Sequence, residues 1–278
     1  MKTQRSRPRP NPAASAPVPV KLMLVIAYDG SGYDGWQSQR TGVGVQSLVE
    51  AALAKLFPSS PRVFGSSRTD AGVHAMGMAA HFEVPHPEWR MTPARLLLAV
   101  NAHLPSDIRV QAVRRMPAEF HARFSAAGKE YRYLVWNHPA MNPLLRTQAW
   151  HFRRKLDWQA MRAAARDFVG RHDFRSFRVN PDYDTDSTVR TLTRCEVRRR
   201  GPLMTFVIEG DGFLYRMCRG IVGTLVQVGE GKIHSGAVRE ILARCDRTFA
   251  GMTAPAHGLV LWRVLYDRHN LAPRPRPE

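Results

Sequence analysis

Hydrophobic residues recur with two different spacings along residues 21–117, and these spacings predict a mixture of strands and helices. Lys21–Tyr28 is short and almost wholly apolar after its first residue, as expected of a buried strand. Between Val45 and Phe57 the apolar residues follow a 3.6-residue spacing, which is typical of a helix packed on one side. The same reasoning predicts strands at Arg62–Ser66, Gly77–Val84 and Ile108–Met116, and a helix at Thr92–His103.

Residues 118–268 repeat this pattern approximately. Alternating polar and apolar residues predict a strand at Glu130–Asn137, and Asp157 is a suitable N-cap for a helix at Asp157–Val169. A break at Gly201-Pro202 separates two strand-like runs and predicts a hairpin. The remaining predicted elements are the hairpin strands Val189–Arg199 and Leu203–Glu209, helices at Phe213–Val228 and Ser235–Cys245, and a strand at Leu259–Tyr266.

The approximate duplication predicts an α+β protein with two halves, residues 21–117 and 118–268. Each half can form a small sheet that helices cover on one face. Joined edge to edge, the two sheets would form one surface with a cleft between the halves. Residues 1–20 contain five prolines and several basic residues, so we expect a disordered arm there. A similar composition predicts a tail at residues 269–278.

The cysteine and histidine positions argue against disulfide and metal chemistry. Cys195, Cys218 and Cys245 are far apart in the sequence and form no CxxC pair, which favours a reducing compartment. The histidines show no HExxH or Cys/His grouping, so we predict no metal. The apolar run Leu22–Ala27 is too short for a membrane span or a signal peptide. We therefore expect a soluble, cytoplasmic protein with no membrane partner.

The charge balance predicts a polyanionic partner. The chain has 41 lysines and arginines against 23 acidic residues, and its formal net charge is +18. Four of these basic residues lie in the predicted arm, so most of the charge belongs to the part predicted to fold. A field of this size attracts nucleic acid and speeds its capture. Codon bias in a GC-rich genome explains arginine in place of lysine, but it does not explain the excess of bases over acids.

The segment Gly65–Phe82, GSSRTDAGVHAMGMAAHF, contains the carboxylate best suited to chemistry. Asp70 lies between predicted strands, and Gly72 after it permits a sharp backbone turn. Aspartates in such segments often serve only a turn or a helix cap, and this segment alone leaves that alternative open. Other enzyme classes are disfavoured, because the Gly-rich loop Tyr28–Gln39 lacks the lysine of a phosphate-binding loop. The chain also has no GxSxG elbow and no zinc deaminase signature.

Basic and aromatic residues are interleaved in three segments, as expected of a surface that binds unpaired nucleotides. Arginines bind phosphates, and aromatic rings stack on bases, although the same aromatic residues can equally be core residues. The segments are FHARFS at Phe120–Ser125, GKEYRYLVW at Gly128–Trp136 and HDFRSF at His172–Phe177.

The predicted helix Phe213–Val228 places Arg219 among apolar residues. A buried arginine needs an anionic partner, because an uncompensated charge in the interior is costly. Glu230 or Asp211 would form a local structural pair, whereas Asp70 would form a pair across the cleft.

Six segments, in this order, resemble the tRNA pseudouridine synthase A (TruA) family and together span about residues 21–268. They are YDGSGYDGWQ at Tyr28–Gln37, SRTDAGVHA at Ser67–Ala75, FHARFSA at Phe120–Ala126, KEYRY at Lys129–Tyr133, DFRSF at Asp173–Phe177 and GFLYRMCRGIVG at Gly212–Gly223. The sequence departs from the family pattern at Ser67, Cys218 and Gly220, where the family often has glycine, valine and asparagine. None of these departures removes a charged group.

The resemblance implies a fold of two RRM-like (ferredoxin-like) halves, joined into one mixed, mostly antiparallel sheet with helices on one face and a central basic cleft. It implies an isomerase that converts uridine to pseudouridine at positions 38, 39 and 40 in the anticodon stem-loop of tRNA. Family members act as homodimers. No redox cofactor is implied, because the reaction neither oxidises nor loses anything.

On the matching positions, the resemblance implies that Asp70 is the catalytic nucleophile and that Arg219 is its ion-pair partner. A carboxylate is ionised at neutral pH and needs no separate base to activate it. Tyr131 is implied to pack against the target base and to take part in proton transfer.

Further residues of these segments are expected to bind the substrate. The resemblance implies that Arg68 enters the RNA stem and helps to hold the target nucleotide out of the helix. His121 and Arg123 are expected to contact RNA, and His74 is a structural or RNA-facing residue. Two alternatives stay open, namely an RNA-binding module without activity and a pseudouridine synthase with another RNA target.

Overall fold

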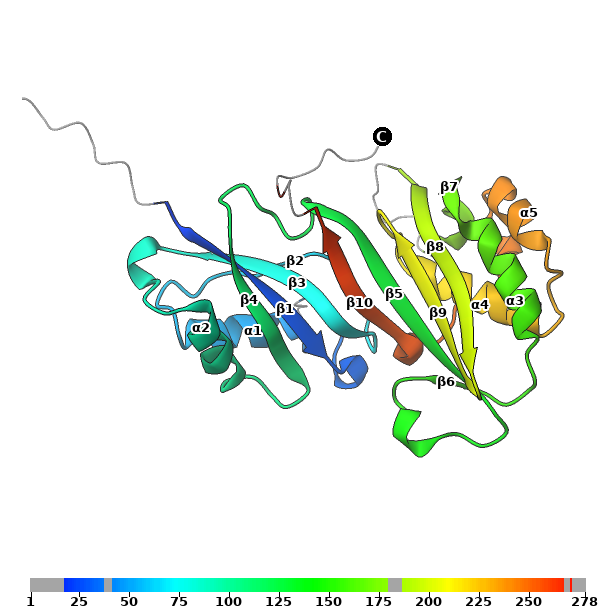
Figure 1. Ribbon diagram of the computed structural model, residues 1–278, viewed down its shortest axis with the longest axis horizontal. Coiled ribbons are helices and arrows are strands. Elements are labelled where there is room, and N and C mark those ends of the chain that lie inside the picture. Colours follow the sequence, from blue (N-terminus) through cyan, green and yellow to red (C-terminus); the bar gives the residue numbers. More distant parts are fainter. Residues whose placement is uncertain (1–17, 38–41, 180–186, 268–270, 272–278) are drawn as a thin grey trace, which may run out of the picture.

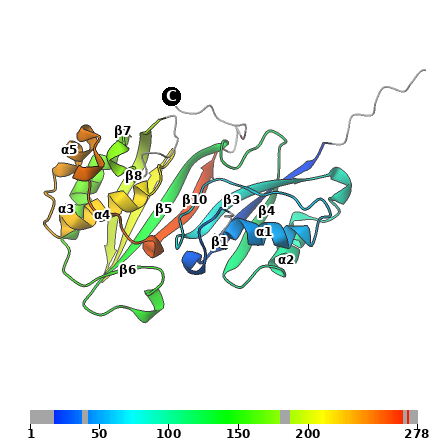
Figure 2. The ribbon, with the colours of Figure 1, turned by 180° about the vertical axis from the view of Figure 1, so that it is seen from behind.

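The computed structural model describes residues 18–37, 42–179, 187–267 and 271, so most of the predicted arm and tail lies outside the described residues. The ten strands of this described part form one sheet in the order β4-β1-β3-β10-β5-β9-β8-β7, with β2 beside β3 and β6 beside β5. Figures 1 and 2 view the molecule from opposite sides and show the helices packed against one face of the sheet. The predicted α+β class, with a mixed and mostly antiparallel sheet, is confirmed.

The first half has the βαββαβ order of a ferredoxin-like unit. Its elements are β1 (Val20–Tyr28), α1 (Val45–Ala54), β2 (Phe64–Gly65), β3 (His74–Val84), α2 (Pro93–Asn101) and β4 (Ile108–Met116). In the sheet these strands run β4-β1-β3-β2, and β1 pairs antiparallel with both β3 and β4. The helix α1 buries Val45, Val49 and Leu53 in the core, and their four-residue spacing places them on one side of the helix.

The second half repeats this strand order with different residues. Its elements are β5 (Ala126–Asn137), β6 (Trp150–Phe152), α3 (Trp158–Ala165), β7 (Gly170–Asp173), β8 (Val189–Arg200), β9 (Leu203–Gly210), α4 (Met217–Gly229), α5 (Ala237–Arg244) and β10 (Leu259–Tyr266). The order β10-β5-β9-β8 corresponds position by position to β4-β1-β3-β2, and β7 extends the edge. The duplication predicted from the sequence is therefore visible as two copies of one strand order.

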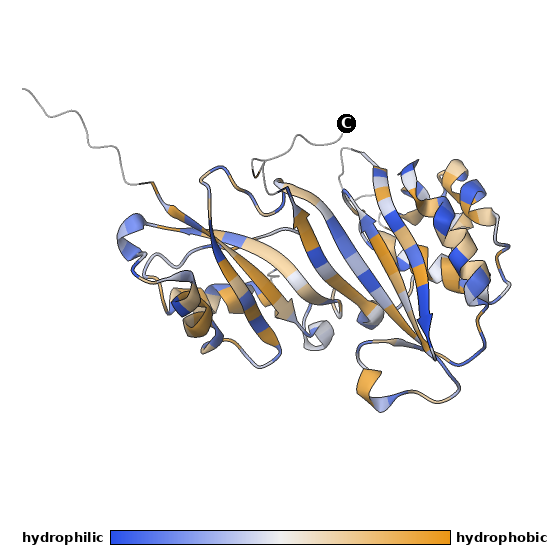
Figure 3. Ribbon diagram, in the orientation of Figure 1, coloured by the Kyte–Doolittle hydropathy of each residue, from blue (hydrophilic) through white to orange (hydrophobic). Residues whose placement is uncertain are grey.

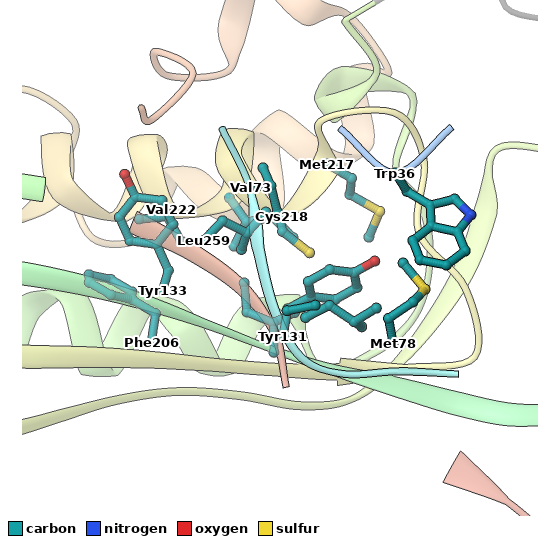
Figure 4. Close-up of a cluster of buried hydrophobic side chains, with 14 of the residues drawn as sticks. Trp36, Val73, Met78, Tyr131, Tyr133, Phe206, Met217, Cys218, Val222 and Leu259 are labelled. Atoms are coloured by element: carbon teal, nitrogen blue, oxygen red, sulfur yellow. The ribbon is translucent and has the colours of Figure 1, made fainter. Parts of the chain in front are cut away.

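The two halves meet at β3 and β10, which form a short parallel pair that we call the seam. The paired residues are Val260 with His74 and Leu261 with Ala75. Gly77 lies beside the seam, where a Cβ atom would come within 2.7 Å of the carbonyl oxygen of Trp262, so a residue without a side chain is needed. The core is continuous across the seam, and Figure 4 shows Val73 of the first half in one cluster with Tyr131 and Cys218 of the second.

Strand β5 presents different chemistry to the two faces of the sheet. Tyr131 and Tyr133 are buried on the face that the helices cover, and their neighbours Glu130 and Arg132 point to the other face. Glu130 is nevertheless fully buried, because the guanidinium groups of Arg132 and Arg263 each lie 2.7 Å from one of its oxygens. Figure 3 shows hydrophilic and hydrophobic residues alternating in the same way along β8.

Several element boundaries differ from the prediction. The strands β1, β3 and β5 begin at Val20, His74 and Ala126, whereas the predicted starts are Lys21, Gly77 and Glu130. Gly77 and Gly128 hide the beginnings of β3 and β5, because glycine is uncommon in strands. The short strands β6 and β7 are absent from the prediction, since three or four residues are too few to reveal a period.

The helix α4 begins at Met217, and the predicted start at Phe213 is wrong. The residue before the helix, Arg216, has a left-handed backbone with φ 58° and ψ 11°, which a continuing helix does not allow. None of the described helices combines the length and apolar character that a membrane span requires.

Candidate active site

The loop between β2 and β3 carries Asp70 and is fixed to the first half at two points. The hydroxyl groups of Thr69 and the buried Tyr28 are joined by a hydrogen bond of 2.8 Å. The backbone N–H of Trp36 donates to the carbonyl of Thr69 at 3.2 Å. Gly72, with φ +76°, supplies the left-handed turn that follows Asp70. These contacts restrict the backbone on both sides of Asp70 and therefore limit where its carboxylate can lie.

Asp70 forms an ion pair with Arg219 of α4. Nη1 of Arg219 donates to Oδ2 of Asp70 at 2.9 Å, and Nε of Arg219 donates to the carbonyl of Ala254 at 2.8 Å. The two side chains are 18% and 13% exposed, so the pair is partly buried but still in reach of solvent. Of the acids that the sequence offers to Arg219, the structure selects Asp70, while Glu230 pairs with Arg154.

A second arginine, Arg216, lies beside the same carboxylate. Its Nε atom is 3.9 Å from Oδ2 of Asp70, a distance at which ionic attraction acts but no hydrogen bond forms. Within the described residues this buried Nε atom has no hydrogen-bond partner. The guanidinium lies over the ring of Tyr215, 4.8 Å from its centre. The left-handed backbone of Arg216 costs about 1–2 kcal/mol for a residue with a side chain.

Arg216 is not among the residues that the sequence singles out. A helix that starts at Phe213 makes Arg216 an ordinary helical residue one turn before Arg219, and only the break at Met217 gives it a special place. The available signal is that the otherwise apolar segment FLYRMCRG contains an arginine, Arg216, in addition to Arg219.

Tyr131 of β5 packs against the loop that carries Asp70. Its hydroxyl and that of Ser67 are 3.0 Å apart, and its ring meets the ring of Phe213 edge-on, with 5.0 Å between centres. Figure 4 shows Tyr131 close to Cys218 in the buried cluster. Burial raises the pKa of Tyr131, so its hydroxyl stays protonated at neutral pH. A neutral, buried phenol is better suited to packing and hydrogen bonding than to removing a proton.

His74 has a structural position, which is one of the two roles expected for it. It is buried at the start of β3, where the N–H of Gly30 donates to its Nδ1 atom at 3.0 Å. Its Nε2 atom lies 3.0 Å from the carbonyl oxygens of Thr147 and His257. Its Nδ1 atom also lies 3.1 Å from Oδ1 of Asp29, and together these contacts tie three loops to one another.

Arg68 and His121 lie at different places relative to Asp70. Arg68 is exposed in the same loop, two residues before Asp70. His121 instead packs against the ring of His81, with 4.6 Å between the ring centres, and joins an aromatic cluster with Phe64. Burial lowers the pKa of both histidines, that of His81 to about 4, so both are neutral at pH 7. Within the described residues, no contact joins His121 to Asp70.

Arg123, in the loop before β5, belongs to a group of cations around Lys129. Burial and the positive charges of Arg123 and Arg190 lower the pKa of Lys129 to about 8. Lys129 precedes Tyr131 by two residues, so it lies on the same face of the sheet as Tyr131. Its side chain forms no hydrogen bond or ion pair with the described residues. Cations gathered in this way repel one another and suit a polyanionic ligand.

Thiol chemistry is disfavoured by the environment of the buried cysteines. Cys195 and Cys218 are buried and form no disulfide. Burial raises the pKa of Cys195 to about 12 and that of Cys218 well above its ordinary value. Thiols with such pKa values are poor nucleophiles. In the described ranges, no group of three or more His, Cys, Asp or Glu residues is arranged to hold a metal ion.

A family profile described as tRNA pseudouridine synthase matches residues 24–125 and 164–267. The tRNA pseudouridine synthase A of Brevibacillus brevis is 45% identical over 246 residues, which cover 87% of this chain and 98% of that protein. Its namesake from Methylacidiphilum infernorum is 42% identical over 87% of this chain and 94% of that protein.

A third relative, tRNA pseudouridine synthase A of Syntrophotalea carbinolica, is 45% identical over 87% of this chain and 95% of that protein. A chain in the crystal structure of a Cbf5-Nop10-Gar1 complex is similar at a TM-score of 0.34 and 13% identity, over 86% of this chain and 48% of that one. A likeness of that size carries no argument. The family profile matches both segments that supply the Asp70–Arg219 pair, and the chain belongs to the tRNA pseudouridine synthase family.

Proposed function

We propose that this protein is an isomerase that converts uridine to pseudouridine in tRNA. The observation that carries the proposal is the Asp70 carboxylate, held by Arg219 within reach of solvent in a chain of this family. The reaction breaks the bond between C1′ of the ribose and N1 of uracil and forms a bond from C1′ to C5. C5 loses a proton and N1 gains one, so atoms and electrons balance without an oxidant or a reductant.

Asp70 can begin this reaction in three ways. Its carboxylate can attack C1′, add to C6 of the uracil ring or remove the proton from C2′. Each route needs a carboxylate oxygen that is not already engaged by donors. Oδ2 accepts the hydrogen bond from Arg219, whereas Oδ1 accepts none from the described residues. Arg219 therefore orients the carboxylate and leaves Oδ1 available for the reaction.

We assign Tyr131 to base binding. Its ring lies in the same cluster as Phe213 and its hydroxyl reaches the loop of Asp70, so a uracil that enters this site meets an aromatic surface. The raised pKa of Tyr131 favours this packing role over the alternative role in proton transfer. The proton on C5 can then leave to water or to the Asp70 carboxylate.

The substrate in this proposal is the anticodon stem-loop, with positions 38, 39 and 40 as targets. RNA would lie in a central basic cleft on the face of the sheet that carries Lys129 and Tyr131, and the cations around Lys129 support this placement. Arg68 would enter the stem from the Asp70 loop, and His121 and Arg123 would contact the RNA farther along. The family resemblance also supports a cytoplasmic homodimer, built from chains whose halves are residues 21–117 and 118–268.

The test is to incubate purified protein with unmodified tRNA and to map pseudouridine at each nucleotide. We expect product at positions 38–40 with the wild-type protein and none with Asp70→Asn, while the tRNA dissociation constant stays within a few-fold. Asp157→Asn is the matched control, because it removes a carboxylate at the N-cap of α3 and asparagine caps helices equally well.

Three outcomes would change the proposal. A normal rate of product formation in Asp70→Asn contradicts the catalytic assignment. Wild-type protein that binds tRNA but forms no pseudouridine is an RNA-binding module. Product at other nucleotides identifies a pseudouridine synthase with a different target.

A further inference from the structure

Arg216 and Arg219 both face the Asp70 carboxylate, but they differ in exposure and in hydrogen bonding. Arg219 is 13% exposed and donates to both Asp70 and the carbonyl of Ala254. The side chain of Arg216 is 38% exposed and makes no hydrogen bond to the described residues. A guanidinium has five N–H donors in a planar fork, so the hydrogen-bonding capacity of Arg216 is still available for a ligand.

The position of Arg216 limits what this ligand can be. Arg219 already supplies the charge that opposes Asp70, so the site with both arginines has one positive charge in excess. The Cζ atom of Arg216 lies 4.8 Å from the centre of the Tyr215 ring, and the N–H groups of Arg216 make no hydrogen bond to the described residues, so they remain available to a ligand. An excess positive charge with an open planar fork is suited to a single anionic group with paired oxygens, such as a phosphodiester.

We propose that Arg216 binds a phosphodiester group of the target nucleotide and so positions C1′ of that nucleotide beside Asp70. This inference rests on the proposed function, because it concerns the substrate of the same site. A phosphate and the C1′ atom of one nucleotide are joined through a single ribose ring. A cation whose Nε atom is 3.9 Å from the reacting carboxylate is therefore at a suitable distance to hold that phosphate while the sugar faces Asp70.

The experiment is a double-mutant cycle between Arg216 and the RNA backbone. Anticodon stem-loop RNAs are made with a neutral methylphosphonate in place of the phosphate on the 5′ or the 3′ side of the target uridine. Binding of each RNA to the wild type, Arg216→Gln and Arg216→Lys is measured against salt concentration. Glutamine and lysine tolerate the left-handed backbone about as well as arginine does, so all three chains should fold alike.

We expect wild-type affinity to fall roughly 10-fold when one of the two phosphates is neutralised, as loss of a charge-assisted hydrogen bond predicts. Arg216→Gln should bind unmodified RNA more weakly than the wild type by a similar factor. On that methylphosphonate RNA, Arg216→Gln and the wild type should have almost the same affinity. Affinity falls as salt rises, and the magnitude of the slope of log affinity against log salt should be smaller by about 0.7–0.9 in Arg216→Gln and unchanged in Arg216→Lys. Arg95→Gln, which removes an exposed arginine from α2, is the matched control and should not show this coupling.

The inference is overturned if Arg216→Gln weakens binding of each methylphosphonate RNA by the same factor as it weakens binding of the unmodified RNA, because the two changes are then independent. An unchanged salt slope in Arg216→Gln would do the same and would make Arg216 a residue that only orients Asp70. Because binding is read separately from product formation, a wild-type protein that binds RNA without forming pseudouridine refutes the proposed function and still leaves this coupling measurable.

Discussion

Asp70 and Glu130 each face two arginines, and the two groups lie on opposite faces of the sheet. Glu130 is fully buried, and Arg132 and Arg263 engage both of its oxygens at 2.7 Å. Asp70 is 18% exposed and has one hydrogen bond at 2.9 Å from Arg219, on Oδ2. The first carboxylate has no remaining capacity for a ligand, whereas the second keeps one oxygen open.

The difference separates a structural ion cluster around Glu130 from the cluster around Asp70, which we propose is catalytic. Arg263 of β10 and Glu130 of β5 join neighbouring strands, and Arg132 stacks on the ring of Trp262 at 3.8 Å, so each member of that cluster is held by several contacts. At Asp70 the contacts hold the loop and Arg219 firmly, while the carboxylate itself is only partly satisfied. Unused bonding capacity at a well-held group is therefore what distinguishes the catalytic candidate.

The largest expected effect is on catalysis at Asp70. Asp70→Asn removes the carboxylate that we propose begins the reaction and should lower the rate of pseudouridine formation by roughly 10⁴-fold or more. The melting temperature should change by only a few degrees, because the pair is partly solvated. Single-turnover kinetics and thermal unfolding on the same preparation measure both quantities, and a large loss of stability would remove the contrast with Glu130.

Glu130→Gln should show the reverse pattern. An amide leaves two guanidinium groups without their full counter-charge and turns an N–H donor toward one of them. Breaking a buried ion pair in this way costs about 3–5 kcal/mol, which urea unfolding would reveal. The folded fraction should keep its single-turnover rate, and a rate loss without a stability loss would show that the cluster acts on the reaction.

Tyr131→Phe tests the role of the β5 tyrosine that packs against the Asp70 loop. Removing the hydroxyl breaks one hydrogen bond to Ser67 and keeps the ring, so we expect a loss of about 1 kcal/mol in stability. The rate should fall by less than about 10-fold if Tyr131 only packs against the base. A fall of 10²-fold or more, which is typical of a lost acid or base, would assign it to proton transfer.

The smallest expected effect is a pH dependence of RNA binding, and it concerns Lys129 in comparison with Lys21. Lys21 is buried and bonded to the carbonyl of Phe120 and to Glu83, whereas Lys129 has no partner in the described part of the chain. The charge of Lys129 is lost as pH rises through about 8, so RNA affinity should fall a few-fold between pH 7 and 9. Binding at pH 8 should take up a proton, and calorimetry in buffers of different ionisation enthalpy would detect it. Lys129→Met should abolish this uptake.

The same pKa shift has a defined effect on folding. The ordinary pKa of lysine, 10.5, is higher than the value of about 8 in the folded state, so the unfolded chain binds more protons between these pH values. The contribution of Lys129 to the free energy of unfolding therefore rises as pH increases from about 8 to 10.5. Unfolding curves of the wild type and Lys129→Met, compared at pH 8 and pH 10, would show the difference.

Regular spacing made most of the fold predictable. The longer strands of both halves and the helices α1, α2, α3 and α5 follow from apolar periodicity, because each buries one side in a local unit, whereas the short strands β6 and β7 do not. The pairing of Asp70 with Arg219 was one of three options, and local sequence cannot choose among acids that lie up to 149 residues away from an arginine.

The features that escaped prediction depend on contacts distant in sequence. The left-handed backbone at Arg216 and the late start of α4 leave no mark in the hydrophobic pattern. The placement of His121 with His81 rather than at Asp70 comes from the packing of rings on β2, β3 and the loop before β5. Such arrangements require the completed sheet.

The seam also has a consequence for how the protein is made. Strand β10 leaves the ribosome after all the other described strands and helices, yet it occupies the middle of the sheet between β3 and β5. Until it emerges, the nascent chain has two unpaired strand edges, and nothing brings the Asp70 loop to α4. A nascent chain that still lacks β10 therefore has no assembled site with which to act on RNA.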